Sequence, residues 1–178
     1  MFKNVHHLTS SAEFLKAVRA KDIEEARRIA KLNPWAVRGN EALDLRLTAA
    51  HIAVKAKDWE MLRFFETLEN FDFDQGDVQG ETPLIKAIVG KDLDIVKFLV
   101  SKGVRLSFSD QAVKPSWNPV YVAACLGTQE TLEYLLGLGL DPNEETSMQR
   151  TALTKACWMG REENVRVLLA HPDIKIDF

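Results

Sequence analysis

The chain has 178 residues, of which 46% are hydrophobic and 28% are charged, a balance typical of a globular rather than a disordered protein. Its formal net charge of −3 argues against a nucleic-acid-binding protein, which needs a basic surface. The first residues lack the apolar core of a signal peptide, no apolar run is long enough to cross a membrane, and the two cysteines fit neither a zinc site nor a disulfide framework. We therefore expect a soluble protein of a reducing compartment, in the cytoplasm or, as the alternative, in the nucleus.

The first predicted elements are two helices that follow a flexible N-terminal segment, residues 1–9. Ser10 and Glu13 have the spacing of a capping box, in which two side chains satisfy the free amides at a helix start. Asp22 and Glu25 repeat this spacing before a second apolar run. The sequence therefore predicts a first helix from about Ser10 and a second from about Asp22.

A longer connection, NPWAVRGNEALDLRL, spans residues 33–47. We expect Trp35 to pack beneath it because the side chain is bulky and its neighbours are apolar, with exposure for a ligand as the alternative. A shorter insertion is expected just before Trp117.

Residues 82–103 give the clearest view of one unit. Thr82 and Pro83 can open a helix, since Thr caps the free amides and Pro fits the first turn. Lys91 ends that helix and Asp92 can cap the next one. The second helix has a buried stripe formed by Ile95, Val96, Leu99 and Val100. The unit is thus predicted to be two short antiparallel helices joined by a turn.

A Lys-Asp pair recurs between the predicted helices, beginning at Lys21, Lys57 and Lys91. We expect each Lys to adopt a positive φ, at a cost of about 1 kcal/mol, and each following Asp to cap the second helix. A row of anion-binding lysines is the weaker alternative, because each Lys has an acidic neighbour.

The units return with a period of about 35 residues, which predicts a solenoid of stacked repeats. The motifs TPLIKAIVGK (82–91), NPVYVAACLG (118–127) and TALTKACWMG (151–160) resemble the ankyrin repeat; TAAHIAVKAK (48–57) and AEFLKAVRAK (12–21) resemble it more weakly. The resemblance implies an all-α ankyrin repeat solenoid of stacked antiparallel helix pairs with hairpin-like connecting loops. It predicts a domain over residues 10–178 with about five repeats, roughly at 10–33, 46–76, 77–109, 113–143 and 146–175.

The same resemblance implies a non-enzymatic protein that binds another protein, whose identity the sequence does not reveal. The family binds through hairpin tips and through exposed positions of each first helix, which line a concave groove. The matching partner-binding candidates here are Glu81, Val89, Trp117, Leu126, Arg150, Trp158 and Met159. Trp, Arg and Met are enriched at interfaces, so we expect the C-terminal half of the groove to carry most of the affinity.

The C-terminal end offers an architectural alternative. NVRVLLAHPDIKIDF leaves apolar side chains without a following polar repeat to cover them. The chain would then be a subunit that docks through this end, or a fragment of a longer ankyrin array. The end-docking candidates are Val165, Leu168 and Leu169.

Asn143 provides a further alternative, as a substrate of asparaginyl hydroxylation. It lies at the hairpin position where ankyrin proteins often present an asparagine, eight residues after Leu135. Pro142 departs from the usual valine.

No residue set predicts catalysis. His51 lies in the Thr-Pro-Leu-His position, where the resemblance implies a structural role through hydrogen bonds between turns. Cys125 is expected at an exposed groove position and Cys157 in a buried slot for a small side chain.

Metal and phosphate sites are not predicted either. Asp72, Asp74 and Asp77 lack the loop and terminal glutamate of a calcium site, and the chain has no glycine-rich phosphate loop. We expect no metal, no cofactor, no small-molecule substrate, and neither nucleic acid nor membrane as a partner.

Overall fold

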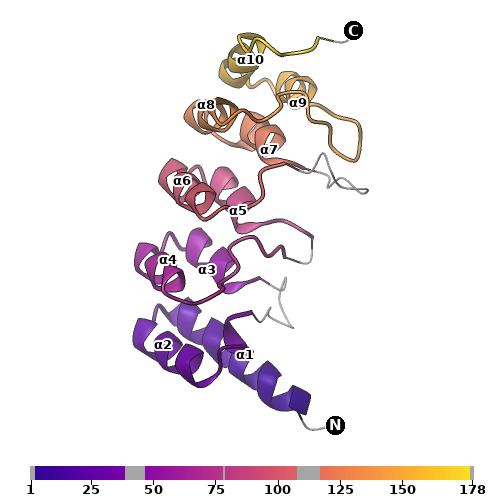
Figure 1. Ribbon diagram of the computed structural model, residues 1–178. Coiled ribbons are helices and arrows are strands. Elements are labelled where there is room, and N and C mark those ends of the chain that lie inside the picture. The colour runs from indigo at the N-terminus through magenta and orange to yellow at the C-terminus, as the bar shows by residue number, and fades with distance from the viewer. Residues whose placement is uncertain (1–2, 39–46, 78, 108–116, 177–178) are drawn as a thin grey trace. The chain divides into compact units, whose positions relative to one another are not determined.

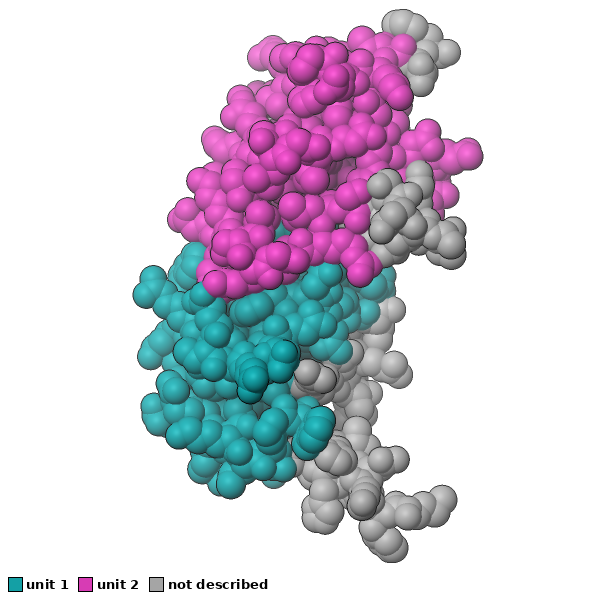
Figure 2. All heavy atoms as spheres, in the orientation of Figure 1, with its two compact units in different colours: residues 1–86 teal, residues 87–178 magenta. Residues whose placement is uncertain are grey.

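The computed structural model describes residues 3–38, 47–77, 79–107 and 117–176. The chain divides into two compact units, residues 1–86 (unit 1) and 87–178 (unit 2), which Figure 2 distinguishes by colour. The described residues form ten α-helices and no strand (Figure 1), which confirms the predicted all-α class.

The helices follow one another in pairs along the chain. Unit 1 contains α1 (Lys3–Ala20), α2 (Ile23–Leu32), the 3-10 turn η1 (Ala36–Arg38), α3 (Ala49–Lys55) and α4 (Trp59–Glu66). Helix α5 (Pro83–Val89) contains the boundary between the units. Unit 2 continues with α6 (Leu93–Ser101), α7 (Pro119–Leu126), α8 (Gln129–Gly137), α9 (Ala152–Trp158) and α10 (Glu162–Leu169). Within the units, α1 packs on α2, α3 on α4, α7 on α8 and α9 on α10, as the predicted helix pairs require.

The Lys-Asp pairs act as predicted between the helices of a pair. Lys21, Lys57 and Lys91 have φ values of 58°, 51° and 55°. The following Asp22, Asp58 and Asp92 each accept a hydrogen bond from the backbone N–H three residues later, at 3.0, 3.0 and 3.2 Å. The strained Lys turns the chain, and the Asp satisfies a free amide of the next helix.

The first helix begins earlier than the sequence predicts. Helix α1 starts at Lys3, so residues 3–9, which were expected to be flexible, are helical and the Ser10–Glu13 spacing does not mark a helix start. No Gly or Pro interrupts residues 3–20, and a helix interior tolerates the serines at small cost. The repeat boundaries remain predictions.

The prediction for Trp35 is wrong. Its side chain is 64% exposed and lines a 340 Å³ cavity together with Pro34 and Leu68. The neighbouring Ala36 is buried in its place, because the turn η1 directs the small residue inward. The insertion expected before Trp117 lies in residues 108–116, outside the described residues.

The two units have different cores. In unit 1, the Phe65 ring stacks on Phe71 with centroids 4.4 Å apart. The centroid of the Phe14 ring, on α1, lies 6.2 Å from that of Phe65. In unit 2, aliphatic side chains such as Leu132 and Leu135 are fully buried instead. Both cores are closed by second helices with one apolar face.

In unit 2, α10 caps the C-terminal end of α7. The Asn164 side chain is buried and donates from Nδ2 to the carbonyl oxygens of Ala124 at 2.8 Å and Ala123 at 3.3 Å. Arg161 donates from Nη2 to the carbonyl of Gly127 at 3.0 Å. The last carbonyls of a helix have no partner within it, so these bonds hold the two helix pairs together.

We expect Asn164→Ala to lower the free energy of unfolding by about 1–3 kcal/mol, because it leaves buried carbonyls with fewer donors. Urea denaturation followed by circular dichroism measures the change. Glu163→Ala, at the exposed neighbouring position, is the control and should change the free energy by less than about 0.5 kcal/mol. Equal effects of the two substitutions would contradict the capping role.

Candidate protein-binding surface

Unit 2 exposes large apolar side chains where its first helices end. Val89, Leu126 and Trp158 are the last residues of α5, α7 and α9, and Met159 follows directly. Their exposed fractions are 45%, 44%, 78% and 38%. We call these four residues the first-helix surface. Helices α7 and α9 pack against each other, so Leu126 and Trp158 occupy equivalent ends of neighbouring helices.

The two cysteines are placed opposite to the predictions. Cys125 is buried and Cys157 is exposed. Cys125 lies on α7, and the next first helix, α9, packs against α7. Cys157 lies on α9, and among the described helices no further first helix packs against α9. Burial raises the pKa of the Cys125 thiol to about 11, so it stays protonated and is a poor nucleophile.

A cavity of 410 Å³ adjoins the first-helix surface. Its described lining consists of Arg150, Thr154, Lys155 and Trp158. The Lys155 ammonium lies 3.7 Å from the centroid of the Trp158 ring, a cation–π contact between positions three apart on α9. We call this the cationic cavity.

The hairpin before α9 fixes Arg150 at the edge of the cationic cavity. The Thr146 amide donates to the Arg150 carbonyl at 3.1 Å, and the Gln149 amide donates to the Thr146 carbonyl at 2.9 Å. Gln149 has a φ of 54°, which closes the turn. Burial raises the pKa of the Tyr121 hydroxyl, while the positive charge of Arg150 acts in the opposite direction.

The other two predicted partner-binding residues have different surroundings. Glu81 belongs to unit 1, where it is half-buried and forms an ion pair with Lys86. Trp117 belongs to unit 2, where it is half-buried directly before Asn118, the N-cap residue of α7. Both residues therefore lie two positions before the start of a first helix.

The end-docking candidates differ in exposure. Leu168 is fully buried, Val165 is half-buried and Leu169 is 48% exposed. Of these three, Leu169 alone offers a largely open side chain, since Leu168 belongs to the core.

Asn143 connects its hairpin to the C-terminal segment. Its Nδ2 donates to the Asp173 carbonyl at 2.8 Å, and its Oδ1 accepts from the Lys175 amide at 2.8 Å. Both ends of the amide are therefore engaged.

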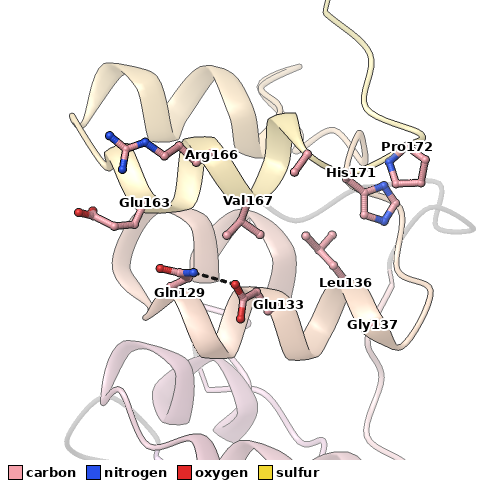
Figure 3. A pocket seen from close by; sticks show the side chains of 10 residues that line it. Gln129, Glu133, Leu136, Gly137, Glu163, Arg166, Val167, His171 and Pro172 are labelled. Carbon is pink, nitrogen blue, oxygen red and sulfur yellow. Dashed lines mark hydrogen bonds between the residues drawn. The ribbon is translucent and has the colours of Figure 1, made fainter.

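A larger cavity, of 610 Å³, lies between α8 and α10 (Figure 3). Leu136 and Val167 form part of its wall, and the Gln129 side chain donates to Glu133 at 2.7 Å. The sequence did not predict this cavity, because the pattern of second helices indicates only a buried stripe. Two small residues on its wall, Gly137 and Ala170, are the signal that the sequence offers. The charged residues that line it are Glu133, Glu163 and Arg166, so it favours no single charge in a ligand.

Two kinds of site have no counterpart in the part of the chain that the structure describes. His, Cys, Asp and Glu side chains nowhere gather there in threes as a metal ion would require. None of the described helices combines the length and apolar character needed to span a membrane.

Comparison with known proteins places these features in context. A family model described as ankyrin repeats (3 copies) matches residues 14–110 and 106–178. A putative ankyrin repeat protein of Rickettsia felis (strain ATCC VR-1525 / URRWXCal2) is 34% identical over 155 residues, which cover 85% of this chain and 35% of that protein. The chain thus spans about a third of the length of this relative.

Proposed function

Because this chain belongs to the ankyrin repeat family, whose members are protein–protein interaction modules and typically not enzymes, we propose that it binds a partner protein through its first-helix surface. The observation that supports the proposal is the exposure of Val89, Leu126 and Trp158 at the last position of three first helices. Apolar side chains repeated at equivalent positions are unusual on a surface that contacts only water.

The chemistry of these side chains suits an interface. Trp158 offers a large aromatic area, and Trp is among the residues that most often dominate binding energy. The neighbouring Met159 can adapt to an irregular partner surface. Both residues lie on or directly after a helix packed on α7 and α10, so binding them requires little ordering of the chain.

Docking through the C-terminal end is the second candidate function. It is supported by Leu169 and Ile176, which are 48% and 51% exposed. The hydroxylation alternative at Asn143 is less favoured, because the C-terminal segment must first release the side-chain amide.

Affinity purification from a native lysate with three baits tests the first proposal: the unaltered chain, Leu126→Asp with Met159→Glu, and Leu169→Asp. The substituted positions are exposed, so circular dichroism should show all three folded. We expect the double variant to bind the captured partner at least about tenfold more weakly, since it places charges on an apolar contact. A partner that is lost with Leu169→Asp and kept by the double variant would instead support end docking.

A further inference from the structure

Charge is divided unevenly between the helices of unit 2. The acidic residues of its helices all lie on second helices: Asp94 on α6, Glu130 and Glu133 on α8, and Glu162 and Glu163 on α10. The first helix α7 has neither an acidic nor a basic residue, and the only charged residue of α9 is Lys155. Of these two first helices, α9 carries a charge of +1 and α7 carries none, although the whole chain carries a net charge of −3.

Three cations lie around α9 and the helix α7 packed against it: Arg150, Lys155 and Arg161. Arg161 donates to the Gly127 carbonyl at 3.0 Å, and Arg150 lines the cationic cavity together with Lys155 of α9. Burial raises the pKa of the Cys125 thiol, and the positive charges of Lys155 and Arg161 both oppose that shift. Across the described residues, none of these three cations forms an ion pair with a carboxylate.

The two cations of the cationic cavity have geometry suited to a carboxylate. Arg150 presents a planar guanidinium that can bind two carboxylate oxygens at once, and Lys155 adds a second positive charge. The Trp158 ring beside Lys155 gives an apolar surface for the stem of the incoming side chain. The larger cavity between α8 and α10 lacks this bias, since Glu133 and Glu163 face it together with Arg166.

We propose that the cationic cavity binds an acidic side chain from an extended peptide segment of the partner protein, whose neighbouring apolar residues contact Trp158. This inference rests on the proposed function, and it adds the chemical class of the partner. The second helices α8 and α10 have a net negative charge and repel the same segment, so charge also sets the face on which it binds.

A selection of short random peptides displayed on phage, with the unaltered chain as the immobilised target, tests the inference. We expect the selected peptides to be enriched in Asp and Glu next to an apolar residue. Changing those residues to Asn and Gln should weaken binding about tenfold, and added salt should weaken it further. Arg150→Glu with Lys155→Glu should cause a similar loss. Arg166→Glu, a charge reversal at an exposed position on α10, is the control and should leave affinity unchanged.

The outcomes separate this inference from the proposed function. The selected peptides could lack acidic enrichment and yet fail to bind the double variant Leu126→Asp with Met159→Glu. That result would overturn the inference and leave the proposed function standing. Peptides insensitive to both double variants would overturn both. A selection that yields no binding peptide would overturn an extended segment as the occupant, while the lysate experiment would still report on a folded partner.

Discussion

Lowering the pH from 6.5 to 4 is expected to reduce the free energy of unfolding by about 3 kcal/mol through His51 alone. Burial lowers the pKa of this imidazole to about 4, with the nearby Asp77 opposing the shift and Lys86 adding to it. The side chain is 1% exposed, so a charge on it has almost no access to water.

The hydrogen bonds of His51 show which tautomer its neutral imidazole adopts. The Nε2–H donates to the Glu81 carbonyl at 2.9 Å, because a carbonyl can only accept. Nδ1 is then the unprotonated nitrogen and accepts from the Thr48 hydroxyl at 2.7 Å. This arrangement links the start of α3 to the next hairpin, as the resemblance implied, and a second proton on Nδ1 would remove the acceptor.

The sign of the pH effect follows from which state takes up the proton. Between pH 6.5 and 4 the unfolded chain protonates this histidine and the folded chain does not, so stability falls as pH falls through this range. The contribution is fully present above pH 6.5 and is lost below about pH 4.

Urea denaturation at a series of pH values, in the unaltered chain and in His51→Gln, measures this effect. The variant should be less stable at neutral pH and should lose less stability on acidification. Subtracting one curve from the other cancels the contribution of the carboxylates to the pH dependence, because they titrate in both proteins. Parallel curves would show that His51 does not have a lowered pKa in the folded chain.

The features that the sequence predicted correctly are those formed by neighbouring residues. The Lys91 turn and the Asp92 cap depend on contacts within a few positions, so the pattern alone determines them. The role of His51 was also predictable, because the motif fixes the distance along the chain to the next hairpin. The exposed ends of α7 and α9 were implied by the resemblance to the ankyrin repeat.

The features that the sequence did not predict depend on which neighbours a side chain faces in the folded chain. Consecutive helical positions point about 100° apart, so Cys125 and Leu126 differ in burial although both were expected to be exposed. Whether Trp35 packs inward depends on the backbone of η1, which the composition of its loop does not reveal. The cationic cavity combines a hairpin residue, Arg150, with three residues of α9, and no helical spacing places Arg150 beside them.

Replacing Leu168 by Asp is expected to lower the free energy of unfolding of the last helix pair by about 4 kcal/mol or more. The substitution removes a fully buried aliphatic side chain and places a carboxylate where no water reaches it. Leu169→Asp changes the adjacent, 48% exposed position on the same helix and should cost no more than about 0.5 kcal/mol.

The damage from Leu168→Asp should be local, because a repeat protein is held together mainly by contacts between neighbouring repeats. Amide hydrogen exchange should show lost protection in α9 and α10, with smaller changes in α1 to α4. Equal protection in the Leu168 and Leu169 variants would show that the Leu168 side chain is not part of the core.

The difference in burial between Leu168 and Leu169 decides which variant can distinguish the two binding proposals. Helix α9 ends at Trp158, so a variant that opens the last helix pair also disorders the first-helix surface and the cationic cavity. A partner lost with Leu168→Asp would therefore fit docking at either surface. Leu169→Asp leaves α9 intact, so loss of the partner with this variant would point to the C-terminal end, and retention would point to the first-helix surface.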